Sequence, residues 1–286
     1  MDIITTPAAM QTWSRRQAAT GARVACVPTM GYLHEGHLSL IRRAREAADR
    51  VVLTLFVNPT QFGPREDFSV YPRAPERDHA LCAAEGVDVV FQPTTADMYA
   101  PDASVAVVEE SLSTVLCGAS RPGHFRGVCT VVAKLFNCVL PHVAVFGQKD
   151  AQQAIIIRRL VRDLNFPVEI IVAPIMREAD GLAMSSRNVR LSPAERRAAL
   201  GLSRALSLAQ AAFAQGERDS AAVRGWMERE LTASGLRIDY VATVDGATLQ
   251  PAATLAAGVL VALAAYAGET RLIDNCLLAP PHGTRT

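Results

Sequence analysis

Residues 23–57 have the sequence RVACVPTMGYLHEGHLSLIRRAREAADRVVLTLFV. The stretch begins with a short apolar run at residues 23–27 and closes with another at 51–57, and both runs predict buried strands. Between them, residues 38–50 carry apolar side chains at helical spacing and predict a helix. A strand, a glycine-bearing turn, a helix and a second strand make one βαβ unit, which is typical of a parallel sheet.

The same alternation continues to about residue 175. Further strands are predicted at residues 87–91, 143–146 and 168–172, and further helices at 75–85, 128–139 and 151–165. Because the strands are apolar along their length, we expect helices on both faces of the sheet. After residue 175 come two helices and then three strands, at residues 193–215, 219–234, 238–244, 259–265 and 270–278. The chain therefore predicts an α/β domain at residues 1–175 with a Rossmann-like parallel sheet, and a smaller α+β domain at 176–286.

Composition and charge exclude several classes of protein. The 286 residues are 50% apolar, and 29 Lys and Arg face 28 Asp and Glu, so no overall field attracts nucleic acid or an anionic membrane. The alanine-rich stretch at residues 252–268 is shorter than a membrane span and predicts a buried strand. Six cysteines without any C-x-x-C pair predict reduced, mostly buried thiols and a cytoplasmic location.

The segment PTMGYLHEGH, residues 28–37, carries the densest chemical signal. A glycine-bearing turn before a helix N-terminus is where an α/β sheet binds phosphate. Gly31 and Gly36 have Walker A spacing, but His37 takes the lysine position, and the G-x-G-x-x-G of dinucleotide sites is missing. His34 and His37 lie three residues apart and face one ligand together. That spacing suits phosphate binding, and helix capping or metal binding would explain it equally well.

Two short segments resemble known nucleotide-binding signatures. His34-Glu-Gly-His37 resembles the H-x-G-H of Rossmann-like nucleotidyl-transferring enzymes, and Met184-Ser-Ser-Arg-Asn188 resembles the basic serine-containing loop that accompanies it. In order along nearly the whole chain, seven segments and a C-terminal one resemble the pantothenate synthetase (pantoate–β-alanine ligase) family: PTMGYLHEGH, FVNPTQF, YPR, RPGHFRGV, FGQKD, Gln152-Gln153, READGLAMSSRN and GETRLIDN.

The resemblance implies an ATP site and a catalytic set. Its ATP-binding residues are Met30, Gly31, Tyr32, Leu33, His34, Glu35, Gly36, His37, Gly147, Gln148, Lys149, Asp150, Met176, Met184, Ser185, Ser186 and Arg187. The implied catalytic residues are His37, His34, Lys149 and Arg187. The family often has valine where this chain has Met176, a position that contacts the adenine through its backbone, so the change in side chain is tolerated.

The residue chemistry agrees with these roles. Lys149 and Arg187 supply positive charge to a polyanionic nucleotide inside a nearly neutral protein. By resemblance Gln61 binds pantoate and β-alanine, and Gln153 binds pantoate; a neutral amide leaves a carboxylate nucleophilic, which a clamped cation would not. Asp150 suits either the nucleotide with its Mg²⁺ shell or an N-cap of the following helix.

The histidines outside the H-x-G-H segment receive different expectations. His124, in RPGHFRGV, is expected together with Arg126 in a loop over the substrate. His79 and His142 are expected to be structural.

The implied activity is ATP-dependent condensation of (R)-pantoate with β-alanine through a pantoyl adenylate, giving pantothenate, AMP and pyrophosphate for coenzyme A biosynthesis. The resemblance also implies a C-terminal lid, a homodimer, and Mg²⁺ held through the ATP phosphates without direct protein ligands. Three alternatives are weighed. A mononucleotide adenylyltransferase shares H-x-G-H but needs neither Gln61 nor Gln153, an aminoacyl-tRNA synthetase needs an RNA-binding module, and an ATP-binding sensor releases no pyrophosphate.

Overall fold

The computed structural model describes residues 1–64 and 66–279. The sequence predicts a frayed tail, PPHGTRT, at residues 280–286, and this tail lies outside the described residues. The chain divides into two compact units. The first consists of Met1–Thr114, Arg121–Gln148 and Gln153–Met176, and the second of Val115–Ser120, Lys149–Gln152 and the chain from Arg177 onward. The second unit therefore takes two short segments from the N-terminal half. The predicted domain boundary between residues 175 and 176, and the separate roles of the two domains, stay predictions.

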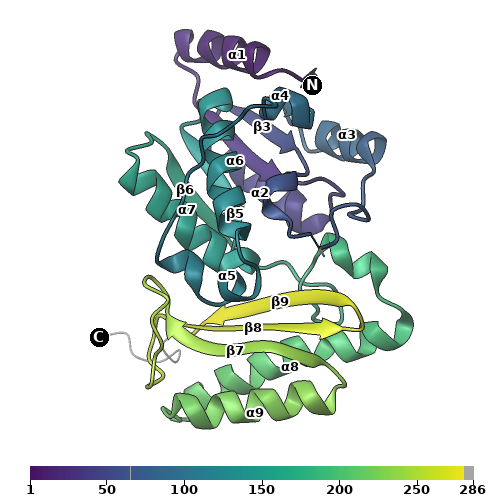
Figure 1. Cartoon of the computed structure of the whole chain (residues 1–286), viewed down its shortest axis with the longest axis vertical. Helices are drawn as coiled ribbons and strands as arrows, with labels where there is room; N and C mark the ends of the chain where they lie inside the picture. The colour runs from purple at the N-terminus through teal and green to yellow at the C-terminus, as the bar shows by residue number, and fades with distance from the viewer. Residues whose placement is uncertain (65, 280–286) are drawn as a thin grey trace. The chain divides into compact units, whose positions relative to one another are not determined.

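The first unit is built on a six-stranded sheet in the order β1-β4-β3-β2-β5-β6 (Figure 1). Every pairing in it is parallel, so the predicted Rossmann-like sheet is confirmed. The strands are β1 (Asp2–Ile4), β2 (Val24–Thr29), β3 (Arg50–Leu55), β4 (Val89–Phe91), β5 (Val143–Gly147) and β6 (Glu169–Ala173). The sequence predicted all of them except β1, whose three mostly exposed residues do not make the apolar run that marks a buried strand.

The predicted helices of the first part of the chain are confirmed as α2 (Glu35–Ala47), α3 (Pro75–Ala84), α6 (His124–Val139) and α7 (Ala151–Asp163). Helix α1 (Pro7–Ala19) was not predicted, because only Met10 and Ser14 of it are buried and the apolar stripe is thin. The remaining short helices and turns are α4 (Thr95–Met98), α5 (Cys117–Ser120), η1 (Pro59–Gln61), η2 (Leu112–Thr114), η3 (Gln148–Asp150) and η4 (Ser186–Arg190).

Both faces of the parallel sheet are covered, as predicted. Ala25 and Val27 of β2 pack in one core with Ile41 of α2, which lies across β2, β3 and β5. The alternate residues Val24 and Cys26 are also buried, and α6 packs on β2. Burial on both sides explains why the strands are apolar throughout.

The second unit holds an antiparallel sheet of β7 (Arg237–Asp245), β8 (Val259–Ala267) and β9 (Thr270–Leu277) with helices α8 (Pro193–Ala214) and α9 (Ser220–Ala233) packed on it (Figure 1). Ser192 and Glu195, which the S-x-x-E spacing predicts as a capping box, form one at the start of α8. The predicted α+β order of this part is confirmed.

Two predictions from the alanine-rich stretch and the cysteines are also confirmed. The alanine-rich stretch contains β8, which is buried along almost its whole length. None of the helices in the described part of the chain has the length and apolar character that a bilayer crossing needs. All six cysteines are free, and five of them are buried.

Candidate active site

Three neighbouring strands of the first unit end at the same edge of the sheet and bring the H-x-G-H segment, Gln61 and Gly147 to that edge. The PTMGYLHEGH segment follows β2, the turn η1 with Gln61 follows β3, and Gly147 ends β5. Strand β2 lies between β3 and β5, where the strand order reverses direction. In open α/β sheets a ligand binds at this position, beyond the carboxyl ends of the strands.

The loop after β2 has a backbone that its sequence partly dictates. Gly31 has φ +84° and Tyr32 has φ +51°, so the chain turns through two left-handed residues. The buried carboxylate of Asp78, on α3, accepts the Tyr32 N–H at 2.7 Å and the Leu33 N–H at 2.8 Å. A Cβ on residue 31 would lie 3.1 Å from Asp78 Oδ2, so both the left-handed backbone and the close approach of Asp78 favour glycine there. Sequence analysis missed Asp78, because it lies 45 or more residues from the atoms it binds.

His34 and His37 meet at the N-terminus of α2. Their ring centroids are 4.0 Å apart, and the His34 backbone N–H donates to His37 Nδ1 at 3.3 Å. Since Nδ1 accepts, the neutral ring of His37 carries its proton on Nε2. Capping and phosphate binding are therefore compatible, because one nitrogen serves the helix and the other is a donor. Within residues 1–64 and 66–279, no group of three His, Cys, Asp or Glu side chains is arranged to hold a metal ion.

Gln61 is buried and its carboxamide has a fixed orientation. Asn58 Nδ2 donates to the Gly127 carbonyl and to Gln61 Oε1, both at 3.1 Å, while Asn58 Oδ1 accepts the Thr60 N–H at 3.4 Å. A carbonyl only accepts and an N–H only donates, so the Asn58 amide can point one way only. Gln61 Oε1 is thereby an acceptor, and its Nε2 is a donor, which lies 3.3 Å from Met30 Sδ.

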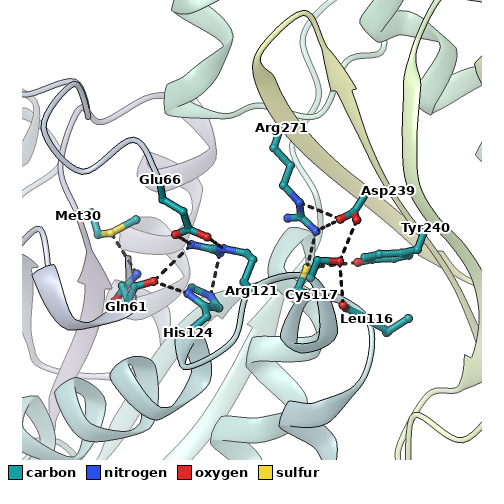
Figure 2. A network of polar contacts seen from close by, with 11 residues as sticks. Met30, Gln61, Glu66, Leu116, Cys117, Arg121, His124, Asp239, Tyr240 and Arg271 are labelled. Carbon is teal, nitrogen blue, oxygen red and sulfur yellow. Dashed lines mark hydrogen bonds and ion pairs between the residues drawn. The ribbon is translucent and has the colours of Figure 1, made fainter. Parts of the chain in front are cut away.

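Further side chains hold this turn in place, and none was predicted as a site residue. The Tyr99 hydroxyl donates to Asn58 Oδ1 at 2.8 Å. Glu66 accepts from Arg121 Nε and Nη2, both at 2.7 Å, and Arg121 Nη1 lies 3.0 Å from His124 Nε2 (Figure 2). Burial alone would raise the pKa of the Glu66 carboxyl, but the hydrogen bonds and charge of Arg121, with smaller contributions from the Gly63 backbone and His124, hold that pKa below its ordinary value.

One expectation in this region is wrong. His124 begins helix α6 and is buried, and Arg126 lies in the same helix, whereas the sequence predicted both in a loop over the substrate. The preceding residue, Gly123, has φ +83° and turns the chain directly into the helix. Without the tertiary fold, the Arg-Pro-Gly-His sequence has the composition of an extended loop.

The predicted cation of the FGQKD segment belongs to the second unit. Lys149 Nζ lies 3.7 Å from Asp150 Oδ2, and the Lys149 carbonyl accepts from Asn275 Nδ2 at 2.9 Å. Asn275 is buried on β9, within the GETRLIDN segment. That segment therefore helps to place the backbone of Lys149.

The loop at residues 177–188 is tied to helix α8. Arg196 donates to Glu178 at 2.7 Å and to Asp180 at 2.6 Å, and Asn188 Nδ2 donates to Glu178 Oε1 at 2.7 Å. The hydrogen bond from Arg196 lowers the pKa of Glu178. Ser185 Oγ accepts the Arg187 N–H at 3.2 Å and so caps η4. The serine-containing segment thus has a defined backbone.

Another polar network, which belongs to the second unit and is also drawn in Figure 2, surrounds Asp239. Asp239 lies at a β-bulge of β7, between Ile238 and Tyr240, and accepts from Arg271 at 2.6 Å and from Ser120 Oγ at 2.9 Å. Arg271 belongs to the GETRLIDN segment. This network holds helix α5 against β7 and β9, which explains why residues 115–120 belong to this unit.

The predicted site residues divide between the units. The first unit contains residues 30–37, Gln61, Gly147, Gln148, Gln153 and Met176, and the second contains Lys149, Asp150 and residues 184–187. The role assigned to each of them in binding or catalysis stays a prediction.

Comparisons with known proteins find similar proteins over almost the whole length of the chain. The family model described as pantoate-beta-alanine ligase matches residues 2–277. The pantothenate synthetase of Moorella thermoacetica is 56% identical over 97% of this chain and 99% of its own. The crystal structure of pantothenate synthetase from Thermus thermophilus has a TM-score of 0.93 and 46% identity, over 98% of this chain and 100% of its own. That of Francisella tularensis pantoate-beta-alanine ligase, complexed with beta-gamma ATP and beta-alanine, has a TM-score of 0.82 and 32% identity, over 97% of each chain.

Proposed function

The chain belongs to the pantoate–β-alanine ligase family, and from that premise we propose how its residues carry out the ATP-dependent formation of pantothenate. The observation that carries the proposal is the meeting of the H-x-G-H segment, the Gln61 turn and the end of β5 at the carboxyl edge of three adjacent strands. Each belongs to a different loop, and a nucleotide with a small acid needs groups from several loops.

Gln61 is proposed to bind the acid. Asn58 Nδ2 donates to Gln61 Oε1, so the Gln61 Nε2 group is left to offer N–H donors. These donors match the carboxylate and hydroxyl groups of pantoate. An uncharged donor orients the carboxylate without neutralising it, so the oxygen stays able to attack. By family resemblance Gln153, near the start of α7, adds a second neutral contact to pantoate, and Gln61 also contacts β-alanine.

The nucleotide is proposed to bind at the N-terminus of α2. His34 and His37 lie at that terminus, where the helix dipole favours phosphate, and His37 Nε2–H is a donor for a phosphate oxygen. Lys149 and Arg187 supply the positive charge, and Ser185 and Ser186 supply further donors. In this proposal residues 176–286 act as a lid that carries Met184–Arg187 to the nucleotide, and this role rests on the resemblance.

The chemistry proceeds in two displacements. The pantoate carboxylate oxygen attacks the α-phosphorus of ATP, and the bond to pyrophosphate breaks. The β-alanine amine then attacks the carbonyl carbon of the pantoyl adenylate, and AMP leaves. Adenylation is needed because a free carboxylate is a poor acyl donor, and exclusion of water protects the mixed anhydride.

Mg²⁺ is proposed to enter with the ATP. Asp150 is half-exposed, and its Oδ2 lies 3.7 Å from Lys149 Nζ. A cation that keeps most of its waters and binds substrate phosphates, as Mg²⁺ does, suits such a site. With ATP bound, the cation would offset phosphate charge, and Asp150 would contact either the nucleotide or the hydration shell of the cation.

A homodimer in the cytoplasm completes the proposal. Val105 and Val108 are 88% and 55% exposed in the segment between α4 and η2 of the first unit. A second copy of the chain would cover them. The six free cysteines are compatible with a reducing compartment.

Pyrophosphate exchange tests the proposed order of steps. With ATP, Mg²⁺ and pantoate, and without β-alanine, we expect labelled pyrophosphate to enter ATP. Exchange that appears only after β-alanine is added would exclude a free adenylate and the two-step mechanism. Exchange that ignores pantoate would favour a mononucleotide adenylyltransferase, and the absence of exchange would favour a nucleotide sensor.

A further inference from the structure

A hydrogen-bonded chain of side chains leads from the partly buried Glu66 and Arg121 through the buried His124 to the backbone of Gln61, and all of them belong to the first unit (Figure 2). His124 Nδ1 lies 2.8 Å from the Gln61 carbonyl oxygen, and His124 Nε2 lies 3.0 Å from Arg121 Nη1. The whole His124 residue is 9% exposed, so its ring makes these contacts largely out of water. The contact from His124 to the Gln61 carbonyl oxygen is shorter than the 3.4 Å contact that Arg121 Nη2 makes with the same oxygen.

The chemistry of these partners fixes the proton of His124. A guanidinium group only donates, so His124 Nε2 must accept from Arg121. A carbonyl oxygen only accepts, so His124 Nδ1 must carry the hydrogen. The ring is therefore neutral and in the Nδ1–H form, and no other protonation state satisfies both contacts.

The pair between Arg121 and Glu66 supports this assignment. Arg121 Nε donates to Glu66 Oε1 and Arg121 Nη2 donates to Glu66 Oε2, so that Nη1 remains to donate to His124. A bidentate pair fixes the plane of the guanidinium group, so the donor that faces His124 has a defined direction.

The other end of Gln61 is already fixed. Asn58 holds the carboxamide oxygen, and Gly127 lets α6 approach the η1 backbone so closely that a Cβ there would lie 2.6 Å from Gln61 Cα. The Gln61 carbonyl oxygen accepts from His124 Nδ1, and Arg121 Nη2 makes a longer contact of 3.4 Å with the same oxygen. The side chain and the backbone of one residue are thus held from two directions.

We propose that His124 is a positioning residue for Gln61: it holds the Gln61 backbone so that the carboxamide donors face the acid substrate, and the Glu66–Arg121 pair sets the ring form that can do so. The proposal rests on the proposed role of Gln61 in pantoate binding. It assigns His124 no contact with the reacting atoms.

Three variants test the positioning role by steady-state kinetics. His124→Leu removes both ring nitrogens, and we expect the pantoate KM to rise about tenfold, the factor that corresponds to one lost hydrogen bond, with the ATP KM unchanged within about twofold. His124→Asn places an amide N–H near the position of Nδ1, so we expect it to recover most of the pantoate affinity. His124→Gln places its amide near the position of Nε2, so we expect little recovery.

The outcomes separate this proposal from the proposed function. If Gln61→Ala leaves the pantoate KM unchanged, the assigned role of Gln61 is wrong. If Gln61→Ala raises it while His124→Leu does not, or while the Asn and Leu variants are equally impaired, the positioning role is wrong. An equal rise in the ATP KM would also overturn it, because a general loss of structure would affect both substrates. Thermal melting of each variant accompanies the kinetics.

Nitrogen NMR of the wild-type protein needs no stable variant. In a ¹⁵N-histidine-labelled sample, two-bond couplings identify which ring nitrogen carries the proton, and the His124 signal is assigned by its absence in His124→Asn or, if that variant does not fold, by its contacts with the Phe125 ring, whose centroid lies 4.8 Å away. We expect the Nδ1–H form at neutral pH. A predominant Nε2–H form or a doubly protonated ring would overturn the proposal.

Discussion

Substitution of Gly127 by alanine should move the Gln61 turn and leave the rest of the chain in place. A Cβ at residue 127 would lie 2.4 Å from the Thr60 oxygen, 2.5 Å from the Thr60 carbonyl carbon and 2.6 Å from Gln61 Cα. All three are backbone atoms, so no side chain can rotate away. An ordinary contact begins at 3.4 Å, and η1 must therefore retreat from α6 by about 1 Å.

The size of the effect follows from three contributions. Overpacking of this kind costs about 1–3 kcal/mol. Alanine in place of glycine within a helix returns about 1 kcal/mol, and the lost hydrogen bond from Asn58 to the Gly127 carbonyl costs about the same. We therefore expect Gly127→Ala to lower the free energy of unfolding by about 1–3 kcal/mol. Since a misplacement of about 1 Å at a binding group costs up to about 10²-fold, kcat/KM for pantoate should fall by about 10- to 100-fold.

Gly225→Ala is the matched control. Gly225 lies inside α9, where a Cβ would meet only Arg229 Nη1 at an ordinary 3.6 Å. This variant should gain up to about 1 kcal/mol from helix propensity and keep its kinetics unchanged. Thermal melting and steady-state kinetics with varied pantoate measure both variants. If Gly127→Ala melts and turns over like Gly225→Ala, the close approach of α6 to η1 does not position Gln61.

Three further substitutions probe the rest of the site. His37→Ala should lower kcat by about 10²- to 10³-fold while calorimetry shows nearly unchanged ATP affinity, because a phosphate donor acts most as charge shifts in the transition state; equal losses in both would remove its catalytic role. Asp78→Asn keeps one acceptor oxygen but turns its NH2 group toward the other N–H, so the ATP KM should rise and the unfolding free energy should fall by about 1–3 kcal/mol; an unchanged melting temperature would show that one of the two bonds, to Tyr32 or to Leu33, is dispensable. Arg121 holds the pKa of Glu66 below its ordinary value, so the pair stabilises the fold above the unfolded pKa of about 4.3 and loses this effect as pH falls through the lower folded pKa. The melting temperatures of wild type and Glu66→Gln should therefore converge on acidification. A difference in melting temperature that stays constant with pH would refute the charged pair.

The sequence predicted the order of elements and the chemistry of its dense motifs. The apolar runs around residues 23–57 predict a strand, a helix and a strand, because local periodicity reports which side chains are buried. The capping box at Ser192 was predictable for the same reason, since it joins residues three apart. The H-x-G-H pair could be placed at a helix N-terminus, but its spacing alone left capping, metal binding and phosphate binding open.

Only the tertiary structure decided how the site is supported. Asp78 lies 46 residues from Tyr32, and Glu66 lies 55 residues from Arg121, so nothing local in the sequence indicates that either pair is bonded. His124 was misplaced because its role depends on the packing of α6 against η1, which Gly127 permits. The physical reason is common to all these cases. Periodicity and motifs report neighbours along one element, whereas the orientation of a buried polar group is set by donors and acceptors that the sheet order brings together from distant parts of the chain.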